Sequence, residues 1–129
     1  MMIIDNTLLD KLTAQAKESP RLRMNMDLRN SAADSSQRML NAIEPGSVVP
    51  IHRHQKTSET VVVLRGRVVE EYYSSAGVLE ASYELAAGGP VFALNIPAGQ
   101  WHTLRALESD TVILEMKDGA YELIGSVMF

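Results

Sequence analysis

After residue 37 the sequence is divided into short runs of β-branched and other apolar residues, each bounded by turn-forming residues. The turns include Glu44-Pro45-Gly46, Arg65-Gly66 and Asp118-Gly119, where glycine permits a positive φ and proline fixes φ. Strand-length runs at such regular spacing are typical of an all-β sandwich or barrel. The expected strands span residues 38–44, 47–54, 59–65, 67–73, 78–85, 91–96, 101–106 and 111–117.

The segment before residue 37 has a different pattern. Leu8, Leu12 and Ala16 recur at helical spacing and Ser19-Pro20 prevents continuation, so residues 7–18 are predicted to form one amphipathic helix. The polar, Arg-rich stretch that follows predicts an irregular strand and a loop. We therefore expect a single domain over residues 1–129, with a helix and Arg-rich segment (1–36), a barrel (37–118) and an apolar tail (119–129).

Composition and charge exclude several classes of partner. A net charge of −4 opposes the phosphate backbone, so nucleic acid is not an expected partner. No run approaches the length of a membrane span and no signal peptide is recognisable, which favours a cytoplasmic protein without a membrane partner. The absence of cysteine means that any metal must be bound by nitrogen and oxygen ligands.

Both ends of the sequence are apolar. Met1 to Ile4 open it, and Ile124, Val127, Met128 and Phe129 lie near its end. Apolar termini either pack under their own domain or cover a neighbouring subunit. Because a sheet also has edges to cover, we expect a homodimer.

The three histidines indicate a metal site. His52 and His54 are two residues apart, so both imidazoles face the same side of a strand. If residues 59–65 form a hairpin with residues 47–54, Glu59 lies across from this pair, and a third strand brings in His102. Three nitrogens and one carboxylate oxygen suit one divalent transition metal, which could be Fe, Mn, Ni, Co or Zn.

These residues resemble the two sequence motifs of the cupin superfamily. The first motif is matched, with every spacing intact, at Gly46, His52, His54, Glu59 and Gly66. The second motif is matched at Pro97, Gly99 and His102, whereas Val91 and Ala106 replace its glycine and asparagine. The resemblance implies a cupin (jelly-roll) barrel with a short N-terminal helix and a metal bound by His52, His54, Glu59 and His102.

The chain also looks like the small single-domain cupins of the WbuC family. The similarity lies in the N-terminal helix, the Arg-rich segment, the start of the strand at Gln37 and the stretch Pro50 to His54. Members of that family are often encoded near O-antigen and other surface-polysaccharide genes. The resemblance therefore implies a small-molecule ligand, anionic or sugar-like, but no particular reaction.

Residues that could bind such a ligand are less distinctive. Arg38 is the first candidate because its strand precedes the motif, followed by Arg29, Asn25 and Arg53. Tyr72 is a further candidate. Tyr72 and Tyr73 are consecutive on one strand, so one faces the interior and the other faces outward. The sequence does not say which, and no catalytic residue is assigned.

Three classes of function remain open. The first is a metal-dependent enzyme that acts on a sugar-type or anionic metabolite of surface-polysaccharide metabolism, by Lewis-acid proton transfer or isomerisation. The second is an Fe(II)-dependent dioxygenase, and the third is a non-catalytic sensor of a metal or metabolite. The metal-independent deoxysugar epimerases share the barrel but resemble a different site, and the intact ligand set argues against their mechanism.

Overall fold

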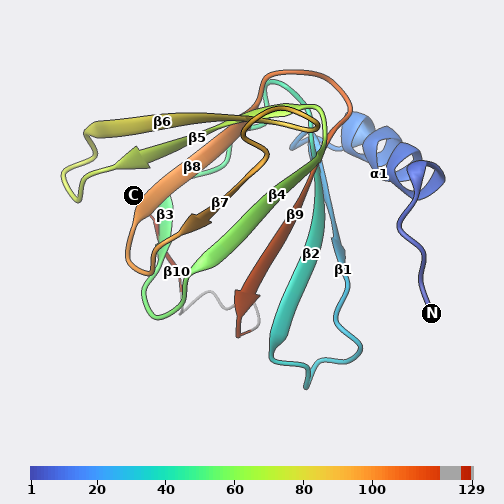
Figure 1. Ribbon diagram of the computed structural model, residues 1–129, viewed down its shortest axis with the longest axis horizontal. Coiled ribbons are helices and arrows are strands. Elements are labelled where there is room, and N and C mark those ends of the chain that lie inside the picture. Colours follow the sequence, from blue (N-terminus) through green and yellow to red (C-terminus); the bar gives the residue numbers. More distant parts are fainter. Residues whose placement is uncertain (120–125, 129) are drawn as a thin grey trace.

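The computed structural model describes residues 1–119 and 126–128 of the chain, and the side chains of residues 1–119. The one helix of the described part precedes a series of strands (Figure 1). The elements are α1 (Asn6–Glu18), β1 (Arg23–Asp27), β2 (Ser36–Ile43), β3 (His52–His54), β4 (Glu59–Arg65), β5 (Arg67–Tyr73), β6 (Leu79–Ala86), β7 (Ala93–Ile96), β8 (Trp101–Ala106), β9 (Thr111–Asp118) and β10 (Ser126–Met128). No helix of the described residues is long and apolar enough to cross a bilayer.

The strands form two antiparallel sheets of five strands each, which together make the expected jelly-roll barrel. Sheet A has the order β1-β2-β9-β4-β7, and sheet B has the order β10-β3-β8-β5-β6 (Figure 1). An apolar core fills one part of the space between the sheets. It is formed by Ile43, Val61, Val63, Val68, Leu85, Ile96, Leu104, Ala106 and Ile113.

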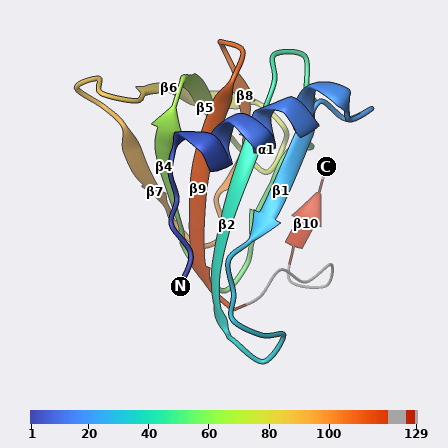
Figure 2. The ribbon, with the colours of Figure 1, turned by 90° about the vertical axis from the view of Figure 1, so that its right-hand side faces the viewer.

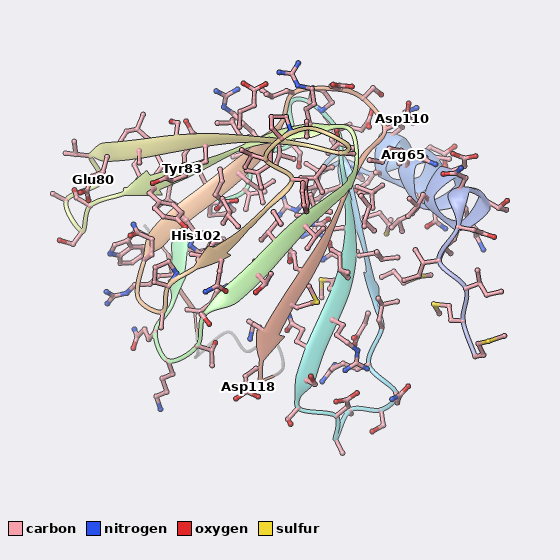
Figure 3. The ribbon with its side chains drawn as sticks, in the orientation of Figure 1. Arg65, Glu80, Tyr83, His102, Asp110 and Asp118 are labelled. Carbon is pink, nitrogen blue, oxygen red and sulfur yellow. The ribbon has the colours of Figure 1, made fainter. Side chains whose placement is uncertain are left out.

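Helix α1 packs across the outer face of sheet A, over β1 and β2 (Figure 2). Its buried residues Leu9, Leu12 and Ala16 meet Leu40, Ala42 and Val112 in a second apolar cluster. Two ion pairs join the helix region to the barrel: Arg65 with Asp10, and Lys17 with Asp110, each at 2.7 Å. Arg65 and Asp110 lie at the end of the barrel beside α1 (Figure 3). Sheet A is therefore covered on its outer face by the helix.

This cover decides which side chains of β2 point into the barrel. Side chains alternate along a strand, so when Leu40 and Ala42 face the helix, Met39 and Asn41 face the interior. The same alternation on β9 places Val112 against the helix and Glu115 inside. The interior face of sheet A thus carries polar residues at one end of the barrel.

The structure corrects several predicted boundaries. The strand expected over residues 47–54 is shortened to β3, because residues 47–51, which follow a turn at residues 45–46, have no regular secondary structure. The hairpin expected between residues 47–54 and 59–65 is wrong, since β3 lies in sheet B and β4 in sheet A. The barrel also begins before residue 37, because β1 is a regular strand paired with β2.

The described residues include the apolar start of the chain and the backbone of β10 near its end. Met1 to Ile4 are exposed. Ile124 and Phe129 lie outside the described residues, whereas the backbone of β10 pairs with β3. The homodimer stays a prediction.

Gly66 connects β4 to β5 at a point where no side chain fits. Its φ of +81° lies in the left-handed region, and a Cβ atom there would stand 2.9 Å from the Cα of Thr111. That contact is with backbone, so a side chain cannot be accommodated by a rotamer change. The close approach explains why the motif ends in glycine.

We therefore expect Gly66→Ala to lower the free energy of unfolding by about 3 kcal/mol or more, because backbone strain and overpacking add. Gly77→Ala is the matched control: its φ is +78°, but a Cβ there meets nothing within 4 Å. The control should cost only about 1 kcal/mol. Equal losses for both variants in urea denaturation would contradict the close-approach explanation.

Candidate metal centre

The three histidines come together at the polar end of the barrel. His52 and His102 are directly paired across β3 and β8, and their ring centroids lie 4.4 Å apart. His54 is two residues further along β3, on the same face. One ligand nitrogen from each ring lies within 4.8 Å of the other two, so the group could hold a metal ion. His102 projects from β8 into the space between the sheets (Figure 3).

Hydrogen bonds define the orientation of two of these rings. The Nδ1 atom of His52 lies 2.8 Å from the carbonyl oxygen of Pro50, and Nδ1 of His102 lies 2.8 Å from that of Gln100. A carbonyl can only accept, so in both rings Nδ1–H donates and a neutral ring has its lone pair on Nε2. This arrangement is the usual one for histidines that bind metals.

Burial keeps both rings neutral. It lowers the pKa of His102 to about 4, with a further contribution from neighbouring His52, and it also lowers the pKa of His52. The Nε2 atom of His102 is buried and has no hydrogen-bond partner among the described residues. A buried polar atom without a partner is unfavourable in a folded protein, and a metal ion would satisfy this one.

Glu59 reaches the histidines from the opposite sheet. It opens β4, and its Oε2 lies 2.8 Å from Nε2 of His54. Burial would raise the pKa of Glu59, but the hydrogen bond from His54 and the nearby histidines lower it below its usual value. The carboxylate is thus ionised beside His54, but it is not part of the three-histidine group that could hold a metal ion. Its expected role as the anionic metal ligand stays a prediction.

A cavity of about 350 Å³ opens beside the histidines. This volume lies within the range of small-molecule sites. Sheet A contributes most of its polar wall, and sheet B contributes the imidazoles. The lining residues of polar or charged type are Arg21, Arg23, Asn25, Gln37, Asn41, His52, His54, Glu59, His102 and Glu115.

Glu115 is the second carboxyl group in the cavity wall. It lies on β9, and the Nδ2 atom of Asn41 donates to its Oε1 at 3.4 Å. Burial raises the pKa of Glu115 to about 8, with a further contribution from the negative charge of Glu59. Its side chain is therefore mostly protonated near neutral pH, unlike that of Glu59.

The structure brings only one of the predicted ligand-binding residues to the cavity, namely Asn25. Arg38 pairs with Asp34 at 2.9 Å and Arg29 with Asp27 at 3.0 Å, so both guanidinium groups are engaged away from it. Arg53 stacks on Trp101 at 4.6 Å.

The open question of Tyr72 and Tyr73 is settled by packing. Tyr72 packs against the apolar core and contacts the ring of Tyr83 at 5.2 Å. It therefore faces the interior but does not line the cavity.

The sequence reasoning missed the polar wall formed by β2 and β9. One signal was present: Asn41 and Glu115 each interrupt an otherwise apolar run, in Met-Leu-Asn-Ala-Ile and Val-Ile-Leu-Glu-Met. A single polar residue in a strand buried on both faces indicates a lined cavity more often than a solvated surface.

One family model matches the sequence. It is described as "Domain of unknown function (DUF6016)" and matches residues 4–85, more than half of the chain. The chain belongs to the DUF6016 family. No curated protein matches this DUF6016 chain significantly in sequence.

Several solved structures share this fold, and one of them is a cupin-2 domain. The capsular polysaccharide assembling protein CapF from Staphylococcus aureus has a TM-score of 0.69 at 17% identity, over 81% of this chain and 29% of CapF. Oxalate oxidase in complex with the substrate analogue glycolate has a TM-score of 0.65 at 18% identity, over 87% of this chain and 57% of the oxalate oxidase chain. Rru_A2000 from Rhodospirillum rubrum, a cupin-2 domain, has a TM-score of 0.63 at 20% identity, over 87% of this chain and 69% of Rru_A2000. The DUF6016 chain therefore has the cupin fold, and it spans less than a third of CapF.

The raised pKa of Glu115 predicts a pH-dependent effect of Glu115→Gln. The unfolded chain loses this proton near pH 4.5 and the folded chain near 8, so the wild-type group lowers stability as pH rises between these values. In metal-free protein, Glu115→Gln should raise Tm at pH 9 by about 5 °C or more and change it little at pH 4. A uniform shift across this range would show that Glu115 is ionised in the fold.

Proposed function

We propose that this chain binds one divalent metal in the barrel and catalyses proton transfer on a small anionic metabolite of sugar type. The observation that carries the proposal is the buried, unpaired Nε2 of His102 beside two further imidazoles in an open cavity. His52, His54, Glu59 and His102 would hold the metal. When bound, it would supply Lewis-acid polarisation of an oxygen atom of the ligand.

Two guanidinium groups favour an anionic ligand. Arg21 and Arg23 both line the cavity, and Nη1 of Arg23 donates to the carbonyl oxygen of Val48 at 2.7 Å. Burial lowers the pKa of Arg23, and the like charge of Arg21 lowers it further, so the two cations repel each other. A carboxylate or phosphate near them would relieve that repulsion. Glycolate, bound to oxalate oxidase, is itself a small hydroxy acid.

Glu115 favours proton transfer over oxygen chemistry. A general acid or base works best when its pKa is near the working pH, and burial brings the pKa of Glu115 to about 8. The group lines the same cavity as the imidazoles, and Asn41 orients its carboxyl. Glu115 can therefore exchange a proton with a ligand in either direction.

The biological setting we propose is surface-polysaccharide metabolism. It is supported by the resemblance to the WbuC family and by the similar fold of CapF, a capsular polysaccharide assembling protein. The DUF6016 match neither names nor excludes that setting.

We expect purified protein to contain about one divalent metal per chain. The double variant His52→Ala, His102→Ala should lose it, and Glu59→Gln should weaken metal affinity about 10- to 100-fold. Glu70→Gln is the matched control, because Glu70 is also a buried interior carboxyl, 1% exposed, but lies outside the cavity wall. Elemental analysis that finds full metal in the double variant would contradict the proposed ligand set.

Proton transfer can be tested in D₂O with metal-loaded protein and a panel of ketoses and their 2-hydroxy and 2-keto acids. We expect deuterium at a carbon next to the carbonyl or carboxylate of at least one ligand, detected by NMR. Glu115→Gln should slow this exchange about 100-fold while metal content stays unchanged, and Glu70→Gln should not slow it. Ligand-dependent oxygen uptake without exchange would instead favour the dioxygenase.

A further inference from the structure

Two buried amide oxygens in the cavity wall lack hydrogen-bond partners. Gln37 and Asn41 are 5% and 8% exposed, and both line the cavity from β2. Among the described residues, no group donates to Oε1 of Gln37 or to Oδ1 of Asn41. Buried acceptors are nearly always satisfied in native proteins, so these two atoms call for a donor from outside the chain.

The neighbouring carboxyl group restricts which end of the Asn41 amide is available. Nδ2 of Asn41 donates to Oε1 of Glu115 at 3.4 Å, so the amide is held by its nitrogen and its oxygen is the end without a partner. A ligand group that meets the oxygen of Asn41 must therefore be a hydrogen-bond donor.

The charges of the cavity decide which donor fits. An ammonium group would be repelled by Arg21 and Arg23, which line the same cavity, and by a bound divalent metal. Carboxylates and phosphates carry acceptors only and cannot satisfy an amide oxygen. A hydroxyl group is a neutral donor, and it fits both conditions.

The spacing of the two amides requires more than one hydroxyl. Gln37 and Asn41 are four residues apart on β2, which separates their Cα atoms by about 13 Å. Met39 faces the cavity between them. One hydroxyl cannot serve both oxygens, so the ligand must present hydroxyl groups along its length.

We infer that Gln37 and Asn41 form a hydroxyl-binding subsite that selects a polyhydroxylated carboxylate, of the sugar-acid class, over less hydroxylated anions. The inference rests on the proposed function, because the metal and the arginines would hold the anionic end of the same ligand. Glu115 acts here as a positioning residue for Asn41.

The test compares ligands that differ only in their remote hydroxyls. Co²⁺-loaded full-length protein is titrated by calorimetry with gluconate, galactonate and mannonate, and with 2-hydroxyhexanoate. All four have six carbons, a carboxylate and a 2-hydroxyl, so the five-membered metal chelate that these two groups form is matched. We expect at least one hexonate to bind about tenfold or more tightly than 2-hydroxyhexanoate.

Variants then assign the preference to the two amides. Gln37→Met and Asn41→Leu should each weaken binding of the preferred hexonate about 5- to 30-fold and leave 2-hydroxyhexanoate within about twofold. The control Gln15→Met, on the exposed face of α1, should change the affinity for neither the hexonate nor 2-hydroxyhexanoate. Without ligand, Gln37→Met should leave the Tm unchanged or raise it, because the substitution removes an unpaired acceptor. If the Gln37 amide instead stabilised the fold, the same substitution would lower the Tm.

The outcomes separate this inference from the proposed function. If 2-hydroxyhexanoate binds but no hexonate is preferred, or if the variants weaken both ligand types equally, the subsite is wrong and the metal site stands. If the wild-type chain takes up no Co²⁺ and binds none of the four ligands, the proposed function fails, and the subsite fails with it.

Discussion

His52 and His102 face each other across the antiparallel pair of β3 and β8, and this pairing determines where the other site residues can lie. The two-residue period of β3 then puts His54 on the same face, while Glu59 can reach the group only from the opposite sheet. The turn before β8 reinforces the pairing, because Gly99, at a φ of +84°, donates its N–H to the carbonyl oxygen of His54 at 2.8 Å. The site therefore depends on the barrel being closed around it.

The interior of the barrel has an apolar part and a polar part. One part is filled by the apolar core, and the other holds the imidazoles, Glu59 and Glu115. Buried carboxyl groups and unpaired amide oxygens cost free energy in the ligand-free protein. The apolar core and the helix cluster on sheet A offset that cost, so the fold can retain a polar end. Glu70 also lies in the interior. Burial raises the pKa of Glu70 well above its usual value, and the negative charge of Glu59 raises it further.

The sequence predicted the elements better than their arrangement. Turn residues and β-branched runs located most strands, and the spacing of His52, His54 and His102 predicted a cluster that the structure confirms as a group able to hold a metal. The pairing of residues 47–54 with 59–65 was wrong because neighbouring strands usually pair, whereas here the chain crosses between sheets. Gln37, Asn41 and Glu115 were missed because helix α1 buries the outer face of sheet A, which removes the alternation that normally marks an interior. Arg29 and Arg38 could not be judged from sequence, since their nearby aspartates decide where each guanidinium lies.

The most direct test of this account is an anomalous diffraction measurement on crystals of protein loaded with one transition metal, recorded above and below its absorption edge. The account predicts one anomalous peak per chain between the two sheets, within bonding distance of nitrogen atoms from His52, His54 and His102, about 2.0–2.2 Å away. A chain with no anomalous peak between the sheets, or with its peak bound by other residues, would contradict the metal site on which the proposed function rests.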